Sequence, residues 1–357
     1  MNAAALLREI VAIPSPSGSE ERVRDLVAAA LRAEGTEPIV SGRNVWASAG
    51  PEDAPALLLC THLDTVRAGS GWTRDPHDPG DDADRVWGLG ANDAGGCAVG
   101  LLHAFVSLAR DGDLPARLVL ALVCDEETGG EGIEALRAEL PPLAAAVIGE
   151  PTELRVATAQ RGLVRFEVTW RGRTAHASRP WQGENAIERA LPDLARLVAV
   201  SFEDVHPLLG RATLQVTNLA AGTGSTNVIP DRCVASGDAR PSPLHPNEEV
   251  VAAIRTAVRD GEITKMRARM TPVETARDEP IVAAALEATG ADDPVGFGGV
   301  SDLFHVRDVP GVVVGPGAPE RSHAPDEWIG VDEIAAGAAT YRRIAQAWMR
   351  RRADADR

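Results

Sequence analysis

Two polar residues at the end of an apolar run are the first in the chain that could carry chemistry. Residues 57–60 read Leu-Leu-Leu-Cys, and His62 and Asp64 follow almost at once. Such a run is typical of a buried parallel strand. A histidine there can bind a metal ion, and a nearby carboxylate can accept its second N–H and fix the tautomer. A histidine at a strand end is more often a hydrogen-bonded structural residue, so the metal interpretation requires further ligands.

Further ligand candidates follow the other predicted strands. The apolar runs 118–124 and 144–148 each end on acidic residues, a glycine-dense turn spans residues 88–96, and residues 312–314 form another short strand. In an α/β layer the carboxyl ends of parallel strands meet on one rim, where such folds place their sites. The candidate ligands are His62, Asp93, Glu127, Glu150 and His323.

Mixed imidazole and carboxylate ligation indicates a zinc site, in which Mn²⁺ or Co²⁺ could substitute. One imidazole and one carboxylate for each ion, with one shared carboxylate, would build a dinuclear site with ions roughly 3.5–4 Å apart. Asp93, in the glycine-dense turn, is placed to be the shared ligand. Each residue also has a plain structural interpretation: Asp93 as a helix cap, Glu150 as a turn carboxylate and His323 as a loop residue.

Glu126 stands directly before Glu127, and two adjacent carboxylates cannot easily reach the same ion. One can bind metal while the other lies against a metal-activated water, whose pKa is near 7 on zinc. The second carboxylate could then take the water's proton and return it to a leaving amine. The alternative is a solvated acidic loop.

Bulk properties narrow the function classes. The chain has 357 residues, which favours two domains, and a net charge of −16, which argues against nucleic acid or an anionic membrane as partner. No apolar run reaches the roughly 18 residues of a membrane span. Residues 1–7 lack the pattern of a secretory signal, and the four cysteines show no Cys-x-x-Cys spacing. We therefore expect a cytoplasmic protein.

The rhythm of the pattern changes twice along the chain. Residues 1–157 alternate strands and helices, and residues 271–357 return to that alternation. Residues 158–270 instead predict the order β-α-β-β-α-β of a ferredoxin-like domain. We therefore expect an α/β fold with a mixed, mostly parallel sheet flanked by helices, and a ferredoxin-like α+β domain inserted into it.

Two local predictions concern the ends of the chain. Ser17 followed by Glu20 has the form of a capping box, which predicts that a helix starts there. A closing helix is expected over about 331–350, and the charged residues 350–357 are expected to be disordered.

The motifs that contain these residues resemble those of a known protein family. The chain is similar to the zinc-dependent acetylornithine deacetylase, succinyl-diaminopimelate desuccinylase and glutamate carboxypeptidase family, which also includes aminoacylases and some aminopeptidases. The resemblance covers nearly the whole chain, and the order and spacing of its motifs are specific. The motifs here span residues 62–66, 90–93, 125–129, 149–152, 174–180, 227–230, 315–317 and 322–327.

The resemblance implies a role for each candidate ligand. By it, one zinc is bound by His62, Asp93 and Glu150, and the other by Asp93, Glu127 and His323. Asp64 orients His62, and Glu126 is the general acid and base that serves an attacking water. The reaction expected is hydrolysis of an N-acyl bond.

The inserted domain is expected to act as a lid and to mediate homodimerisation. The resemblance implies that His176 reaches the partner subunit's site and stabilises the oxyanion. It also implies that Asn227 and Arg240 contact the substrate and that Arg161 lies near its carboxylate. Ser301 and Asp302 match the family's substrate loop. The expected substrate-binding set is therefore Arg161, Asn227, Arg240, Ser301 and Asp302. Asp302 could recognise a cationic amine, or it could be a helix cap.

The substrate is less defined than the chemistry. Residues 71–76 with 92–96 look most similar to the acylornithine or acylcitrulline deacetylase branch of arginine biosynthesis. The alternatives are a succinyl-diaminopimelate desuccinylase, a carrier-bound lysine or ornithine hydrolase of lysine biosynthesis, and a peptidase. The chain departs from the family pattern at Arg67, at Ala94 and Gly95, and at Val300, none of which is a ligand. A non-catalytic relative should have lost Glu126 or His323, and both are present.

Overall fold

The chain divides into two compact units in the computed structural model, which describes residues 2–112, 114–222 and 224–355. The large unit comprises residues 1–158, 275–297 and 301–357, and the small unit comprises residues 159–274 and 298–300. The small unit is therefore continuous in sequence except for three residues, which return to it from the second part of the large unit.

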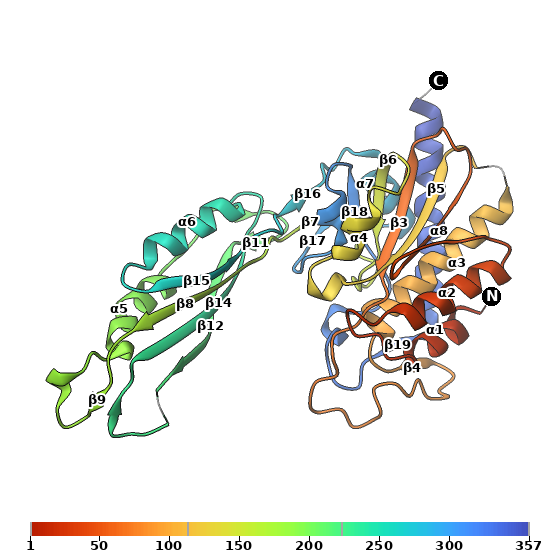
Figure 1. Ribbon diagram of the computed structural model, residues 1–357. Coiled ribbons are helices and arrows are strands. Elements are labelled where there is room, and N and C mark those ends of the chain that lie inside the picture. The colour runs from red at the N-terminus through yellow and green to blue at the C-terminus, as the bar shows by residue number, and fades with distance from the viewer. Residues whose placement is uncertain (1, 113, 223, 356–357) are drawn as a thin grey trace. The chain divides into compact units, whose positions relative to one another are not determined.

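A nine-stranded sheet runs in the order β1-β2-β5-β3-β6-β18-β7-β16, with β17 beside β7 (Figure 1). The pairs β5–β3, β3–β6 and β6–β18 are parallel, while the outer pairs β1–β2, β2–β5 and β7–β16 are antiparallel. The strands are β1 Ile39–Ser41, β2 Asn44–Ala49, β3 Ala56–His62, β5 Arg117–Val123, β6 Leu143–Ile148, β7 Ala157–Gln160, β16 Val273–Glu274, β17 Val295–Phe297 and β18 Gly311–Val313. The expected mixed α/β fold with a mostly parallel centre is confirmed.

The central strand β3 explains the apolar run on which the sequence analysis began. All seven of its residues are buried, because β5 and β6 pair with it on both sides. A strand enclosed by neighbours and covered by helices has no solvent face, so its sequence is continuously apolar rather than alternating.

Helices of the large unit cover this sheet. They are α1 Ala3–Val11, α2 Glu21–Ala33, α3 Gly96–Asp111, α4 Glu131–Leu136, α7 Pro280–Thr289 and α8 Val331–Ala355. The core between them includes Phe105 of α3 and Ile344 and Trp348 of α8. Helices α3 and α7 each pack against α8, and these are the main contacts between helices of this unit.

The expected disorder from residue 350 is wrong as far as residue 355, because α8 continues to Ala355. Arg350 and Arg351 both form ion pairs with Glu287 of α7, which holds the last turns of the helix against its neighbour. Residues 356 and 357 lie outside the described part of the chain.

The expected capping box at Ser17 is also wrong. Helix α2 does follow, but the side chain of its N-cap residue, Glu20, makes no capping hydrogen bond. The Ser17 hydroxyl donates instead to Asp64 Oδ2 at 2.7 Å, and Glu20 Oε1 accepts from the backbone N–H of Gly18 and Asp125. Neither side chain caps the helix, because each forms hydrogen bonds with other partners in the large unit.

Smaller elements complete the large unit. A two-stranded ribbon joins β4 Arg85–Trp87 to β19 Trp328–Gly330. Short turns occupy Ala91–Gly95, Glu126–Thr128, Asp302–Val306 and Pro319–Arg321.

The small unit is a four-stranded antiparallel sheet in the order β12-β14-β8-β15. Its elements follow the chain as β8 Val164–Arg171, α5 Ala186–Val198, β12 Thr213–Ala221, β14 Arg232–Arg240, α6 Asn247–Ala257 and β15 Glu262–Arg267. Apolar residues of both helices and of the sheet form one core. This order and pairing are those of the ferredoxin-like arrangement expected from the alternating pattern. Two short ribbons pair β9 Ala175–His176 with β13 Val228–Ile229, and β10 Val205–His206 with β11 Gly210–Arg211.

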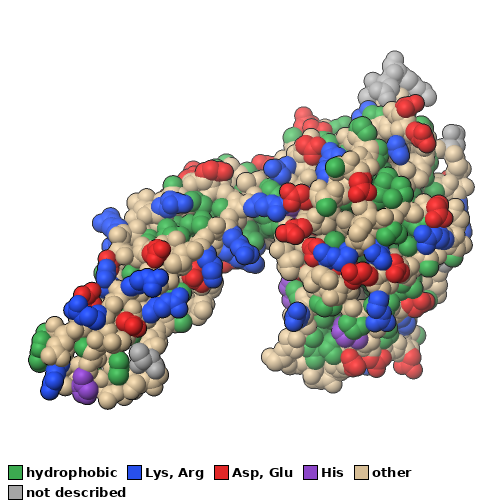
Figure 2. Space-filling model, in the orientation of Figure 1, with side chains coloured by type: hydrophobic (Ala, Val, Ile, Leu, Met, Phe, Trp, Pro, Cys, Tyr) green, Lys and Arg blue, Asp and Glu red, His purple; other side chains and the backbone are tan. Residues whose placement is uncertain are grey.

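The two units differ sharply in charge. The small unit has 15 basic and 13 acidic residues, a net charge of +2, whereas the large unit has 21 basic and 39 acidic residues, a net charge of −18. Figure 2 shows several Lys and Arg side chains spread over the small unit in this view. The acidity of the chain therefore belongs to the unit that carries the candidate ligands.

Within the described residues, the model contains no helix that combines the length and the apolar character needed to cross a bilayer.

Candidate metal centre

Three neighbouring strands bring the first candidate residues to one edge of the sheet. His62 is the last residue of β3 and pairs with Val123 at the end of β5, while Cys60 pairs with Ile148 at the end of β6. The residues that follow β5 and β6, including Glu126, Glu127 and Glu150, therefore emerge beside His62. Parallel pairing places these strand ends together, as the sequence pattern predicts.

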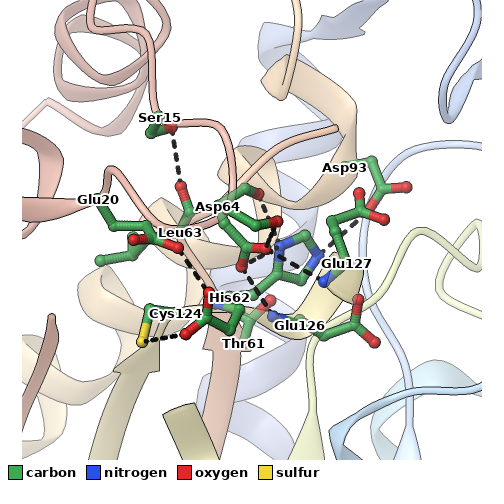
Figure 3. Close-up of polar contacts among 12 residues, drawn as sticks. Ser15, Glu20, Thr61, His62, Leu63, Asp64, Asp93, Cys124, Glu126 and Glu127 are labelled. Carbon is green, nitrogen blue, oxygen red and sulfur yellow. Dashed lines mark hydrogen bonds and ion pairs between the residues drawn. The ribbon is translucent and has the colours of Figure 1, made fainter. Parts of the chain in front are cut away.

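The side chains of His62, Asp93 and Glu127 converge (Figure 3), and each offers a ligand atom within 4.8 Å of the others. Asp93 Oδ1 lies 3.3 Å from His62 Nε2, and its Oδ2 lies 3.6 Å from His323 Nε2. His323 Nε2 in turn lies 2.8 Å from Glu127 Oε1. The two oxygens of Asp93 thus face two different imidazoles, which is the geometry that a shared ligand requires.

The backbone fixes the tautomer of His62. Its Nδ1 lies 2.9 Å from the carbonyl oxygen of Asp64, and a carbonyl can only accept, so Nδ1 carries the proton. In the neutral ring Nε2 then carries a lone pair, and this atom faces Asp93. The Asp64 carboxylate is farther from the ring, with Oδ1 at 3.6 Å from Nδ1.

The Asp64 carboxylate has its shortest contacts with the turn after β5. The backbone N–H of Glu126 donates to Asp64 Oδ1 at 3.0 Å, and the N–H of Glu127 donates to Oδ2 at 3.1 Å. Asp64 is buried, so these two bonds fix the turn that presents both glutamates. Holding this turn is a task of Asp64 that the sequence pattern did not indicate, and the orientation of His62 by its carboxylate stays a prediction.

The turn that carries Asp93 is held by a different acid, Glu327. Glu327 Oε1 accepts from the N–H of Asn92 at 2.8 Å and from the N–H of Asp93 at 3.0 Å. Glu327 is 2% exposed, and burial raises its pKa to about 8. The peptide bond from Asp93 to Ala94 is cis.

His323 is presented by a strained loop that Asp326 fastens to the segment before β4. His323 and Asp326 have φ of 59° and 55°, in the left-handed region that is uncommon for residues other than glycine. Asp326 accepts from the backbone N–H and the hydroxyl of Thr73, at 2.9 and 2.7 Å. The long loop before β4 therefore anchors the segment that contains His323.

Acidic charge accumulates at this site. Burial raises the pKa of Glu126 and of Glu150 well above the usual glutamate range, and the charge of each neighbouring acid adds to the effect at Glu126. Burial works against a charged His62, but its contact with Asp93 and the charge of Glu150 raise its pKa. The hydrogen bond to Glu127 raises the pKa of His323 to about 8.

These residues fit divalent metal ions. Within the described parts of the chain, no lysine or arginine forms an ion pair with Asp93, Glu126, Glu127 or Glu150. Buried carboxylates without a cation are costly, and ligation of a metal is one of the ways in which proteins compensate them. Oxygen and imidazole ligands of this kind suit zinc and its near relatives.

A second group of potential ligands has a different explanation. Glu20, Cys124 and Asp125 also offer ligand atoms within 4.8 Å of one another. Arg43, however, forms ion pairs with both Glu20 and Asp125. The guanidinium already supplies the positive charge that a metal would bring.

The remaining predicted residues of the large unit are Ser301 and Asp302. The Ser301 side chain accepts from the N–H of Leu303 at 3.3 Å and so caps the short turn Asp302–Val306, which leaves Asp302 without that task. Asp302 is 1% exposed, neither of its oxygens has a hydrogen-bond partner among the described residues, and burial raises its pKa to about 7. Asp302 is therefore not the cap of this turn, which removes the helix-cap alternative.

Four predicted residues belong to the small unit, where His176 and Asn227 are neighbours. His176 pairs with Val228 in the β9–β13 ribbon, and the N–H of Ala177 donates to the carbonyl of Asn227. The N–H of Ser178 donates to His176 Nδ1 at 3.1 Å, so the neutral ring must carry its proton on Nε2. His176 is exposed, and its Nε2–H is the donor that an oxyanion would need.

The two predicted arginines are both engaged within the small unit. Arg161 Nη1 donates to the carbonyls of Arg211 and Arg240 at 2.9 and 3.2 Å, and Nη2 donates to that of Leu209. Arg240 Nε donates to Asp238 Oδ1 at 2.7 Å. Arg161 thus has a structural task as a backbone clamp, and the guanidinium of Arg240 is paired with the Asp238 carboxylate.

Among the residues that hold the site, sequence reasoning missed Arg43, Ser178 and Glu327. Glu327 stands in the motif that contains His323, and Ser178 stands two residues after His176, so both lay inside segments already singled out. Arg43 lies in a short turn with no motif, and its buried partners are more than twenty residues away. No local signal in the sequence could have identified it.

Comparisons with known proteins agree with this geometry. Residues 58–347 match the model of peptidase family M20/M25/M40. A protein from Mycobacterium tuberculosis that carries the name of a succinyl-diaminopimelate desuccinylase is 31% identical, over 95% of this chain and 96% of its own length. A protein from Aspergillus terreus that carries the name of a carboxypeptidase is 28% identical, over 96% of this chain and 85% of its own.

Solved structures show the same fold. A metallo-carboxypeptidase of the M20 family from Sulfolobus solfataricus has a TM-score of 0.81 at 17% identity, covering 98% of this chain and 99% of its own. A dinuclear metal-binding peptidase of the M20 family from Bacillus subtilis has a TM-score of 0.69 at 16% identity, covering 96% of each chain.

The chain belongs to peptidase family M20/M25/M40. It is a metal-dependent hydrolase of amide bonds.

Proposed function

We propose that this protein removes an acetyl or succinyl group from the amine of an amino acid, using two zinc ions. One observation carries the proposal: Asp93 directs its two oxygens toward His62 and His323, with Glu126 on the adjoining turn. His62, Asp93 and Glu150 would hold one ion, and Asp93, Glu127 and His323 the other. Co²⁺ or Mn²⁺ could occupy the same ligands.

When bound, the zinc ions would polarise the acyl carbonyl and lower the pKa of a water molecule. The residues of the chain supply the proton transfers. Glu126 takes the proton of the attacking water and returns it to the leaving amine. Burial and the charges of neighbouring acids raise the pKa of Glu126 above the usual glutamate range, which makes it easier for this carboxyl to hold the proton between the two steps.

His176 is the proposed oxyanion donor, with its proton held on Nε2 by the N–H of Ser178. We propose that it serves the partner subunit of a homodimer formed through the small unit. The particle mass in solution tests this assignment. A stable monomer that retains full activity would remove the basis for this role of His176.

Arg240, with Asn227, is the proposed contact for the amino acid carboxylate, because a guanidinium matches a carboxylate with two parallel hydrogen bonds. Arg161 remains a weaker candidate, since its side chain is occupied by backbone carbonyls. In the large unit, Ser301 and Asp302 form the proposed substrate loop. Asp302 is buried without a partner, which supports a substrate with a second, positively charged amine.

Our first candidate substrates are N-acetylornithine and N-acetylcitrulline, from the similarity of residues 71–76 and 92–96 to that branch. Succinyl-diaminopimelate is the second candidate, and the 31% identical relative from Mycobacterium tuberculosis favours it. A carrier-bound lysine or ornithine derivative is the third. An amine on the substrate, which Asp302 could meet, is common to ornithine and diaminopimelate.

A hydrolysis screen tests the proposal. The zinc- or cobalt-loaded protein is incubated with N-acetylornithine, N-acetylcitrulline, succinylornithine, succinyl-diaminopimelate and a dipeptide, and the released amine is measured. We expect the acetylated compounds to be hydrolysed fastest. If both are inert while the succinyl compound reacts, the order of our candidates is wrong, and hydrolysis of the dipeptide alone would replace the deacylase by a peptidase.

A further inference from the structure

The turn that carries Glu126 and Glu127 has three consecutive backbone N–H groups bound to carboxylates. The N–H of Asp125 donates to Glu20 Oε1 at 3.2 Å, and those of Glu126 and Glu127 donate to the two oxygens of Asp64 at 3.0 and 3.1 Å. Glu20 and Asp64 are both buried. The position of the turn therefore depends on where these two acids are held.

Asp125 begins the turn in an unusual conformation. Its φ is 62°, in the left-handed region, which is uncommon for residues other than glycine and benefits from contacts that hold it. Arg43 supplies such a contact, with Nη1 at 3.0 Å from Asp125 Oδ1 and Nη2 against Oδ2. The planar fork of the guanidinium fixes the direction of the carboxylate as well as its charge.

The same arginine joins the two acids beneath the turn. Arg43 Nη1 also donates to Glu20 Oε2, so one cation compensates both Glu20 and Asp125. Glu20 has no exposed side-chain surface, whereas Arg43 is 28% exposed at its side chain. Without the guanidinium, two carboxylates would face each other beside an already acidic site.

Asn44, the next residue, holds the chain on both sides of the turn. Its Oδ1 accepts from the N–H of Cys124, and its Nδ2 donates to the carbonyl of Gly132, both at 3.0 Å. Arg43 and Asn44 together therefore grip residues 124–132 at the start, in the acidic turn and at the end. Arg43 and Asn44 can therefore affect the position of the turn without contacting either the substrate or a metal ion.

We propose that Arg43 and Glu20 are positioning residues, which set the turn so that Glu127 reaches the metal and Glu126 reaches the water. The inference rests on the proposed function for the roles of Glu126 and Glu127. Groups behind metal ligands typically change metal affinity or activity by about 10–100-fold when they are replaced. Arg43 acts at one remove, through Asp125 and Glu20.

The experiment compares Arg43→Met, Arg43→Lys and a matched control, Arg277→Met. Arg277 also forms an ion pair in the large unit, with Asp293 at 2.5 Å, but both side chains are mostly exposed. For each variant we would measure zinc affinity by competition with a chromophoric chelator, kcat and KM on the best substrate of the screen, and the thermal midpoint of the metal-free protein.

For Arg43→Met we expect zinc affinity and kcat to fall about 10–100-fold, with KM within about twofold, because the turn moves while the substrate contacts stay. Arg43→Lys keeps the charge but loses the fork, so it should lie between Arg43→Met and the wild type. Arg277→Met should match the wild type in all three measurements.

A folded Arg43→Met protein with wild-type zinc affinity and kcat would overturn the proposal, even if its thermal midpoint fell, since that result describes a purely structural arginine. If Arg43→Met does not fold, Arg43→Lys decides: unchanged zinc affinity and kcat overturn the proposal. Failure of the proposed function is separate, because a wild type inactive on every substrate still gives a zinc affinity to compare.

Discussion

Two turns present acidic residues to the metal centre, and each is held by buried carboxylates in a different electrostatic setting. In the turn Ala91–Gly95, Glu327 accepts the N–H groups of Asn92 and Asp93, and burial raises its pKa to about 8. In the turn that starts at Asp125, Asp64 and Glu20 accept three N–H groups, and Arg43 pairs with Glu20. The first setting has no ion-paired arginine among the described residues, whereas the second has one.

The presence of an arginine in only one of the two settings suggests that one turn is stable in the metal-free protein, whereas the other depends on bound metal. The turn of Glu126 and Glu127 has its own cation, so it should keep its geometry without zinc. The turn of Asp93 contributes an uncompensated acid, Glu327, to a site that is already acidic. We expect a negative charge on Glu327 to be stable only when divalent ions are bound nearby, because a buried charge needs a partner of opposite charge.

The largest effect is expected from removing the shared carboxylate. Asp93→Asn should abolish stable binding of both ions, since Asp93 faces both histidines. Loss of metal stabilisation worth several kcal/mol corresponds to a rate reduction on the order of 10³-fold or more. Steady-state hydrolysis and metal content after dialysis measure the two effects. A variant that keeps one ion and most of its activity would show that Asp93 is not shared.

The next largest effect should distinguish the two carboxylate clamps in metal-free protein at pH 7. Glu20→Gln removes a charged partner of Arg43 and should lower the free energy of unfolding by about 1.5–3 kcal/mol. Glu327→Gln should cost much less, because a carboxyl with a pKa of about 8 is already mostly protonated at that pH. Urea unfolding in the presence of a chelator measures both. Equal losses would remove the contrast between the turns.

A smaller effect is expected in the pH dependence of the metal-free protein, whose stability should fall as pH rises from about 5 to 8. Unfolded glutamates lose their protons near a pKa of 4.5, whereas folded Glu327 keeps its proton to about pH 8. The folded state binds more protons in this window, so the free energy of unfolding decreases with pH. His323, with its pKa raised from 6.5 to about 8, adds stability below 6.5 that is lost through pH 8.

Bound zinc should reverse this trend, because ligands must be deprotonated to bind metal. Thermal midpoints measured from pH 5 to 8, with and without zinc, test both halves of the prediction. A metal-free protein that becomes more stable toward pH 8 would contradict the uncompensated character of the Asp93 turn.

The smallest effect should come from Ser17→Ala, which sharpens the account of the second turn. Ser17 donates to Asp64 Oδ2, but Asp64 keeps its bonds to the N–H groups of Glu126 and Glu127. We expect a loss of stability of about 1.5 kcal/mol and less than a tenfold change in kcat. If Ser17→Ala lowers kcat as much as Arg43→Met does, the position of the turn depends on Asp64 rather than on Arg43.

The fold and the convergence of ligands were predictable because they follow from strand periodicity. Apolar runs that end on acids locate β3, β5 and β6, and parallel pairing brings the residues after them together. The contacts behind the ligands were not predictable. Ser17 and Glu20 match a local capping pattern, yet tertiary partners at Asp64 and Asp125 claim both side chains. A local sequence pattern cannot show that hydrogen-bond partners distant in sequence compete with the helix end for the same side chains.

The most direct test of the central claim is the zinc content and hydrolysis rate of Glu126→Gln beside the wild type. We predict two zinc ions per chain in both proteins and loss of turnover in the variant, since the metal ligands remain while the general acid and base is gone. Near-normal turnover in Glu126→Gln would contradict its role. A wild type that binds no zinc and hydrolyses its substrate unaffected by a chelator would contradict the dinuclear site itself.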